Sequence, residues 1–298
     1  MNRIVYCVDR GYAIPLAVSL RSLHESNPGK QISVIVLTLD FDDELVARVR
    51  RSVPELEVSF VDVESVIPSG LPRVKAFSRA AYGRLFAPAV LAGSAERILY
   101  LDADTIVLGN LDGLNGVILA DHTLAAVQSV EPPFISGALG VPMWRSLGIS
   151  RDAPYFNSGV LLINPERWIE QRVAERTIEM AQTYSDSNLW ADQDALNIVF
   201  QGDFLRLDQR WNAESPLRKP IHLGHALFDP DEIRSAGEDP AVVHFIGSPK
   251  PWQRGCTDTA APQWWDFLRR TDWADLAPLR RLSVYRELRY RVGLALRG

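Results

Sequence analysis

Cysteine is scarce in this sequence of 298 residues, with only Cys7 and Cys256 present. Two cysteines cannot form the disulfide framework of a secreted scaffold, and their scarcity suits a reducing compartment. Long apolar runs are missing as well, since segments such as IVYCV and ISVIVLTL have the length of a buried strand. The start of the chain, MNRIVYCVDRGY, lacks the charged, apolar and small-residue parts of a signal peptide. We therefore expect a soluble, cytoplasmic protein.

A strong charge of one sign is also absent, because the formal net charge is only −5. A chain without a basic excess gives no reason to expect nucleic acid as a partner. Two common phosphate-binding loops are missing too: no GxGxxG follows the first apolar run, and GxxxxGK[ST] occurs nowhere. These absences exclude the usual dinucleotide-binding and P-loop signatures.

Apolar strands and helical patterns alternate along the chain. The predicted strands are Arg3–Val8, Gln31–Leu39, Glu57–Val61, Arg97–Leu101, Leu124–Val130, Phe156–Ile163 and Ala241–Ile246. The predicted helices are Ala13–Ser26, Asp42–Arg51, Val74–Leu91, Pro165–Thr183 and Asp192–Phe200. Apolar strands separated by helices indicate an α/β fold, with a doubly wound, mostly parallel sheet. Ligands of such sheets bind beyond the carboxyl ends of the strands.

The chain shows no internal repeat and no low-complexity linker. One compact domain over residues 1–255, followed by a C-terminal helical, arginine-rich segment over residues 256–298, fits this pattern best. A Pro/Gly-rich stretch, Glu131–Pro154, interrupts the second half and is a candidate lid.

Two carboxylates follow the apolar run ILYL, at Asp102 and Asp104. Residues two apart share a face of an extended chain, so bare carboxylates would repel each other there. A divalent cation such as Mg²⁺ or Mn²⁺ removes this cost. The same DxDT pattern after a strand is also the signature of phosphohydrolases with an aspartate nucleophile. An acidic turn without chemistry is the third interpretation, because aspartate is common where strands end.

The segment VVHFIGSPKPW supplies further candidates. A neutral imidazole at His244 suits Mn²⁺ as a third ligand, although a lone histidine on an apolar strand is more often a core residue. Gly247 would let the backbone approach a diphosphate, and Lys250 would add a positive charge for it. Taken alone, Lys250 is better explained as a solvated lysine. His222 and His225 have the spacing of metal ligands, but no carboxylate or cysteine accompanies them to complete a ligand set. We therefore interpret them as loop residues.

Polar side chains at two more places suit a polyhydroxylated ligand such as a sugar. Asp192, Gln193 and Asp194 open a predicted helix, where acids also simply complement the helix dipole. The start of another strand, YFNSG, adds Asn157, Ser158 and Gly159. Arg84 lies on a predicted helix, where packing or capping explains it equally well.

Five motifs occur here in the order and approximate spacing of a known family: LDADTIVLGNLDGL, YFNSGVLLINPERW, ADQDALNIVF, LDQRWN and HFIGSPKPW. From about Arg3 to Trp252 the chain resembles the family 8 glycosyltransferases, which include glycogenin and bacterial lipopolysaccharide glucosyl- and galactosyltransferases. The resemblance implies a GT-A fold, a UDP-sugar donor, and Mn²⁺ or Mg²⁺ as cofactor. It also implies transfer of a hexose to a glycan or glycolipid acceptor with retention of anomeric configuration.

By this resemblance, Asp102, Asp104 and His244 match the metal ligands of the family. Asp102 also matches a residue that contacts the donor. The residues that match the contacts to uracil are Asp9 and Tyr12, and those that match the contacts to the diphosphate are Gly247 and Lys250. The residues that match the contacts to the sugar are Arg84, Asn157, Asp192 and Gln193. One departure is Gly11, where many relatives carry asparagine. It puts one hydrogen bond to the ribose or base in doubt.

The resemblance implies Gln193 and Asp192 as the catalytic residues. Retention in glycosidases uses a carboxylate nucleophile beneath the anomeric carbon, whereas Gln193 offers only a weakly basic amide. We therefore favour front-face attack by the acceptor, with Gln193 stabilising positive charge and Asp192 holding sugar hydroxyls. Two alternatives stay open. One is a haloacid dehalogenase-type phosphohydrolase that uses Asp102 and Asp104, and the other is a non-catalytic nucleotide-sugar-binding protein.

Leu279–Gly298 carries six arginines against one acid, Glu287. Apolar residues recur there at steps of three and four, which predicts an amphipathic helix with a cationic flank. Such helices bind anionic membrane surfaces, which predicts peripheral attachment to the inner face of the membrane. Packing of the same face on the domain is the alternative.

Overall fold

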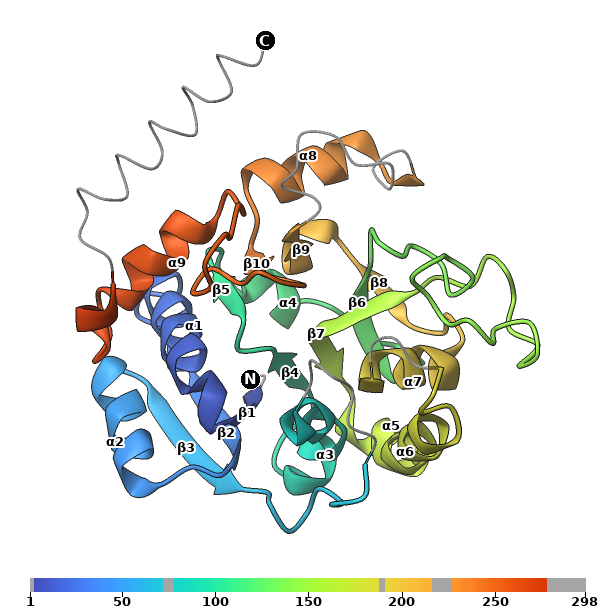
Figure 1. Ribbon diagram of the computed structural model, residues 1–298, viewed down its shortest axis with the longest axis horizontal. Coiled ribbons are helices and arrows are strands. Elements are labelled where there is room, and N and C mark those ends of the chain that lie inside the picture. The colour runs from blue at the N-terminus through green and yellow to red at the C-terminus, as the bar shows by residue number, and fades with distance from the viewer. Residues whose placement is uncertain (1–2, 72–77, 188–190, 216–226, 278–298) are drawn as a thin grey trace.

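A computed structural model describes residues 3–71, 78–187, 191–215 and 227–277 of the chain (Figure 1). Its main sheet has seven strands. Their order across the sheet is β3 (Glu57–Asp62), β2 (Ser33–Leu39), β1 (Arg3–Asp9), β4 (Ile98–Leu101), β7 (Phe156–Ile163), β6 (Leu124–Gln128) and β8 (Leu205–Leu207). Neighbouring strands pair in parallel except at β7, which is antiparallel to both β4 and β6. The predicted mostly parallel sheet is therefore confirmed.

The reversed strand β7 matters for the site. Because it runs against its neighbours, it begins at the edge where β1 and β4 end. Asn157 and Ser158, near the start of β7, therefore lie at the same edge as Asp9 and Asp102. This edge is where open α/β sheets bind their ligands.

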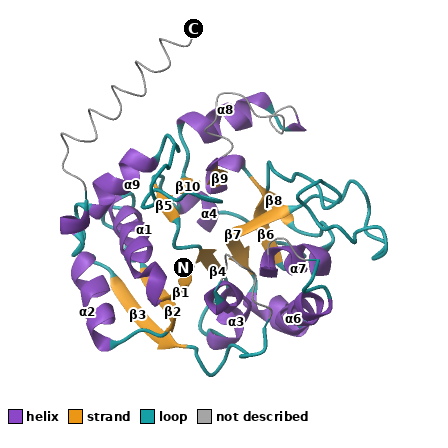
Figure 2. Cartoon of the chain, viewed as in Figure 1, coloured by secondary structure: helices purple, strands orange, loops and turns teal. Residues whose placement is uncertain are grey.

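Helices cover both faces of the sheet (Figure 2). The core on one face includes residues of α1 (Ala13–Glu25), α2 (Asp43–Ser52) and α9 (Ala261–Leu268). The core on the other face includes residues of α3 (Gly83–Val90), α5 (Pro165–Glu170), α6 (Val173–Thr183) and α7 (Ala191–Phe200). Side chains of β1 alternate between the cores: Tyr6 and Val8 belong to the first, and Val5 and Cys7 to the second. This alternation explains why the strand reads as continuously apolar.

A second, small sheet lies beside the first. Its strands are β5 (Thr105–Val107), β10 (Val242–His244) and β9 (Ala213–Glu214), with β10 in the middle. The strand β10 is antiparallel to β5 and places His244 opposite Thr105. Two further helices complete the regular structure: α4 (Asp112–Asn115) and α8 (Pro230–Glu238). Ala236 of α8 packs against Ala213 of β9.

Short 3₁₀ helices occur at Arg10–Tyr12, Arg79–Tyr82, Gln209–Asn212 and Ala274–Leu276. The predicted helix Pro165–Thr183 begins as expected, because Asn164 accepts a hydrogen bond from the backbone nitrogen of Arg167 at 3.1 Å. The prediction of a single helix is wrong, because the segment divides into α5 and α6 where Arg172 adopts a φ of 51°. A left-handed residue cannot continue a right-handed helix.

The stretch Glu131–Pro154 has no helix or regular strand, only an isolated bridge between Phe134 and Pro154. It packs against α7 through a separate apolar cluster, to which Ile135, Val141 and Ile149 contribute together with Ile198 of α7. Its role as a lid stays a prediction.

The proposed boundary at residue 255 also stays a prediction. Beyond it, Trp264 and Phe267 of α9 belong to the core that α1 shares. The arginine-rich stretch Leu279–Gly298 and the residues His222 and His225 lie outside the described residues. Within the described ranges, no helix is long and apolar enough to cross a membrane.

Candidate active site

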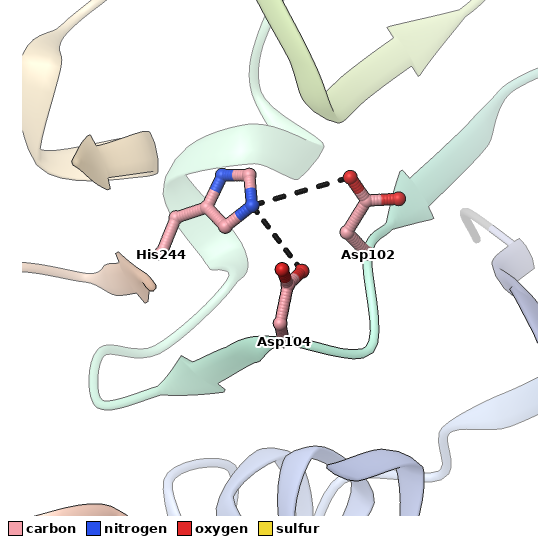
Figure 3. Close-up of side chains that lie close together, drawn as sticks. All are labelled: Asp102, Asp104 and His244. Carbon is pink, nitrogen blue, oxygen red and sulfur yellow. Dashed lines mark ion pairs between the residues drawn. The ribbon is translucent and has the colours of Figure 1, made fainter. Parts of the chain in front are cut away.

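Asp102, Asp104 and His244 converge at the junction of the two sheets (Figure 3). The Nε2 atom of His244 lies 3.3 Å from Oδ1 of Asp104 and 4.0 Å from Oδ2 of Asp102. One ligand atom from each residue lies within 4.8 Å of the others. A turn separates β4 from β5 here, so the two carboxylates meet because of this turn and not because an extended strand alternates.

These three side chains suit a divalent cation. Two carboxylates and an imidazole are ligands that Mn²⁺ accepts, and carboxylates alone suit Mg²⁺. Burial would raise the pKa of Asp104, but the charge of Lys250 above all outweighs it and holds the pKa well below its usual range. Asp104 is therefore ionised at neutral pH, as a metal ligand must be.

Lys250 belongs to this cluster. Its Nζ atom donates to Oδ2 of Asp104 at 2.6 Å and to the carbonyl oxygen of Phe245 at 2.5 Å. The interpretation as a solvated lysine is therefore wrong, because the side chain is held between two acceptors in a half-buried place. In the loop before it, Gly247 has a φ of 69°, which favours glycine.

Arg84 forms ion pairs with two carboxylates. Its Nη2 atom lies 3.1 Å from Oδ1 of Asp102, and its Nε atom lies 2.9 Å from Oδ2 of Asp192. A third contact runs from Nη1 to the hydroxyl of Ser158 at 2.9 Å. The guanidinium carbon also lies 4.9 Å from the centre of the Tyr100 ring, whose hydroxyl donates to Asp102. A buried arginine with these partners fixes where Asp102 and Asp192 point.

Asp192 is almost fully buried at the start of α7. Burial raises the pKa of its carboxyl to about 6, although Arg84 acts in the opposite direction. Among the described residues, no donor makes a well-aligned hydrogen bond to its Oδ2 atom. Such an oxygen remains able to accept a hydrogen bond from a ligand.

Gln193 has its amide held at both ends. Its Oε1 atom accepts from the backbone nitrogen of Ser158 at 2.9 Å and from the Ser158 hydroxyl at 3.2 Å. Its Nε2 atom donates to the hydroxyl of Tyr155 at 3.0 Å. That hydroxyl in turn donates to Asp194 at 2.6 Å. Asp194, which is fully buried, thus holds the tyrosine that contacts Gln193.

Asn157 is buried, and its Oδ1 atom accepts from the Gly159 nitrogen and from Nδ2 of Asn212, both at 2.9 Å. Both lone pairs of this oxygen thus have donors, and within the described ranges its amide nitrogen is left for a ligand. At the end of β1, Asp9 accepts from the backbone nitrogen of Gly11 at 2.9 Å. An added Cβ at Gly11 would lie only 3.2 Å from that carboxylate oxygen. A larger side chain at position 11 would therefore require the Asp9 carboxylate to move slightly.

Tyr12 is partly exposed and meets Trp252 edge to face, with ring centres 6.0 Å apart. Burial raises the pKa of its hydroxyl, and the charges of Asp104 and Asp102 raise it further. Tyr12 therefore lies near the carboxylate pair, and its stacking on a base stays a prediction.

Three residues of this region did not emerge from the sequence as site residues: Tyr100, Tyr155 and Asn212. Asn212 ends the motif LDQRWN and Tyr155 begins the motif YFNSGVLLINPERW, so the motifs pointed to their positions but not to their partners. Their contacts join residues far apart in the chain, which no local pattern reveals.

The model of the family described as glycosyl transferase family 8 matches residues 3–256. The chain belongs to glycosyl transferase family 8. Its curated relatives include lipopolysaccharide 1,2-glucosyltransferase of Escherichia coli, 24% identical over 92% of this chain and 80% of that protein. Lipopolysaccharide 1,3-galactosyltransferase of Salmonella typhimurium is 26% identical over 96% of this chain and 83% of that protein.

Among solved structures, the galactosyltransferase LgtC, in complex with donor and acceptor sugar analogues, matches with a TM-score of 0.78 and 27% identity. The match covers 90% of this chain and 96% of LgtC. This family 8 member therefore has the GT-A fold and is a glycosyltransferase. The phosphohydrolase and the non-catalytic interpretations of the sequence gain no support from these matches.

Proposed function

We propose that this glycosyltransferase transfers a hexose of the glucose or galactose type from a UDP-sugar to a hydroxyl of a glycan or glycolipid, with retention and with a divalent metal. The observation that carries the proposal is the cluster of Asp102, Asp104 and His244, with Lys250 hydrogen bonded to one of its carboxylates. The named activities of the lipopolysaccharide glucosyl- and galactosyltransferases support the choice of sugar and acceptor.

Asp102, Asp104 and His244 would hold Mn²⁺ or Mg²⁺, which when bound supplies Lewis-acid stabilisation of the charge on the leaving diphosphate. Lys250 donates to a phosphate oxygen from the same side, and Gly247 lets the loop backbone approach the diphosphate. Asp9 and Tyr12 contact the uracil, Tyr12 by stacking. With the donor bound in this way, the bond between the sugar and the diphosphate lies beside Asp192 and Gln193.

Asp192 is the residue that holds the sugar. In its ionised form, Oδ2 accepts a hydrogen bond from a sugar hydroxyl, which adds a well-aligned donor to the ion pair that this buried oxygen makes with Arg84. Arg84 keeps this carboxylate and Asp102 at fixed positions through its two ion pairs. The amide of Asn157 donates to the same sugar.

The acceptor hydroxyl attacks from the face that the diphosphate leaves, and the departing phosphate oxygen takes its proton. Gln193 stabilises the positive charge that develops at the anomeric carbon. The new glycosidic bond then forms on the face from which the old bond broke, so the configuration is retained. A cytoplasmic location and an acceptor at the inner face of the membrane complete the proposal.

A panel of nucleotide sugars tests it, with donor binding measured by thermal shift with and without Mn²⁺. A donor at a hundred times its dissociation constant stabilises the protein by about 2.7 kcal/mol, which separates donors from non-donors. We expect UDP-glucose or UDP-galactose to give the largest shift, only with Mn²⁺, and to be slowly hydrolysed without an acceptor. Equal shifts for all nucleotides, or full activity in excess EDTA, contradict the proposal.

A further inference from the structure

The two ring nitrogens of His244 face different partners. Nε2 faces the carboxylates of Asp102 and Asp104 (Figure 3). Nδ1 lies 2.9 Å from Oδ1 of Asn212. Both His244 and Asn212 are buried, so these contacts are not exchanged for water. Which nitrogen of the neutral ring carries the proton depends on which way the amide of Asn212 points.

A chain of hydrogen bonds fixes that orientation from one backbone group. The backbone nitrogen of Gly159 can only donate, so the Asn157 side-chain atom 2.9 Å away must be its oxygen. This oxygen can only accept, so the Asn212 atom 2.9 Å from it must be the amide nitrogen. The other side-chain atom of Asn212 is then its oxygen, and Nδ1 of His244 must supply the proton.

Glycine at position 159 also determines where the ring lies. A Cβ atom added there would lie 2.2 Å from Cε1 and 2.7 Å from Nδ1 of His244. No real side chain makes such contacts, so the ring can rest against β7 only because this residue is glycine. Gly159 therefore acts twice, through its missing side chain and through its backbone nitrogen.

We propose that Asn212, oriented by Asn157 and Gly159, is a positioning residue for the metal-binding histidine. It holds the proton of neutral His244 on Nδ1 and thereby presents the lone pair of Nε2 to a divalent cation beside Asp102 and Asp104. Partners of this kind fix the tautomer and the ring orientation of metal-ligating histidines. The inference rests on the metal dependence of the proposed function.

Nitrogen-15 NMR of the full chain with labelled histidine tests the tautomer without any change at Asn212. The chain has five histidines, and the His244 signals are assigned by their loss in His244→Gln. At mildly alkaline pH we expect Nδ1 to resonate as a protonated nitrogen and Nε2 as an unprotonated one. The reverse pattern overturns the proposal.

Mn²⁺ affinity, measured by the electron paramagnetic resonance of free Mn²⁺ without a donor, tests the consequence. Loss of such a partner typically weakens metal binding about 10- to 100-fold, which we expect for Asn212→Ala. The matched control is Asn27→Ala, because Asn27 is also buried and makes two hydrogen bonds, to Leu23 and Leu111. It lines a hollow with Ile4 and Leu99, away from the carboxylate cluster. The control should lose stability but keep its Mn²⁺ affinity.

The outcomes distinguish a failure of the proposed function from a failure of the proposed role of Asn212. A wild-type chain that binds no Mn²⁺ contradicts the proposed function and this inference with it. Wild-type and Asn212→Ala chains of equal Mn²⁺ affinity contradict only the role of Asn212. If Asn212→Ala does not fold, the tautomer of the wild-type chain decides.

Discussion

The side-chain oxygen of Gln193 accepts a hydrogen bond from the backbone nitrogen of Ser158 at 2.9 Å. The Ser158 hydroxyl adds a second one at 3.2 Å, so both lone pairs of this oxygen have donors. Attack on a sugar carbon would require at least one of these bonds to break. The contact therefore favours a Gln193 that stabilises charge over one that forms a covalent intermediate.

Gln193→Ala should accordingly keep measurable transfer, reduced by about 10²- to 10³-fold, as when one preorganised electrostatic contact is lost. The product should keep its retained configuration, which NMR of the glycoside measures. Gln209→Ala, at another buried glutamine, controls for the loss of a buried amide. Detection of a glycosylated Gln193 by mass spectrometry would contradict the interpretation that Gln193 only stabilises charge.

The carboxylate pair should be indispensable for metal binding. Asp102→Asn and Asp104→Asn are each expected to abolish transfer and to remove Mn²⁺ binding, while the circular dichroism spectrum stays that of the wild type. Asp62→Asn is the matched control, because Asp62 ends β3 at the same edge of the sheet. It should retain full activity. Transfer by either site variant at the wild-type rate contradicts the assignment.

Lys250 and a divalent cation compete for Asp104. The ammonium group lies 2.6 Å from Oδ2, and a hydrogen bond between charged groups contributes roughly 1.5 kcal/mol or more. Lys250→Met should therefore raise the Mn²⁺ affinity of the donor-free protein by about tenfold, while it weakens UDP binding in the presence of Mn²⁺. Lys30→Met, at a lysine paired with Asp112, should change neither affinity. A fall in Mn²⁺ affinity of the Lys250 variant argues against competition.

The arginine-rich segment predicts membrane binding. Each basic residue near an anionic surface contributes about 1 kcal/mol, so the six arginines of residues 279–298 are enough to hold the chain there. Vesicles of anionic lipid should sediment the full chain at low salt but not a chain that ends at Pro278. Neutral vesicles should sediment neither. Equal, negligible binding of both chains to anionic vesicles removes the membrane from the proposal.

The sequence predicts the main sheet because its strands are long and apolar on both faces, as at β1 and β2. It predicts β10 as the longer strand Ala241–Ile246 and misses β5, β8 and β9, since strands of two or three residues are too short to show a period. Asp102 could be assigned from its place after β4. Asn212 could not, because its contact with His244 depends on how β10 pairs with β5 and β9. Local pattern thus gives the strand ends, and tertiary pairing supplies the partners that orient the side chains.

The raised pKa of Asp192 predicts opposite pH effects on stability and on activity. The folded protein holds this proton up to a pH of about 6, whereas the ordinary value is 3.8. Its contribution to stability is therefore complete below the ordinary value and is lost as the pH rises through about 6. A shift of this size corresponds to about 3 kcal/mol, so Asp192→Asn should gain up to that amount relative to wild type as the pH rises from below 3.8 to above about 6. Urea unfolding across this pH range measures it, with Asp121→Asn at an exposed position as the control.

The rate of sugar transfer should depend on pH in the opposite direction. In the ionised carboxylate of Asp192, the oxygen that faces the sugar carries no proton, so it can accept a hydrogen bond from the sugar hydroxyl. The wild-type rate at low donor concentration should fall as the pH drops through about 6. Asp192→Asn should be slow at every pH and should lack this acidic limb, since its amide does not titrate. If the variant keeps the same acidic limb as the wild type, then another group is responsible for it, and Asp192 does not bind the sugar as a carboxylate.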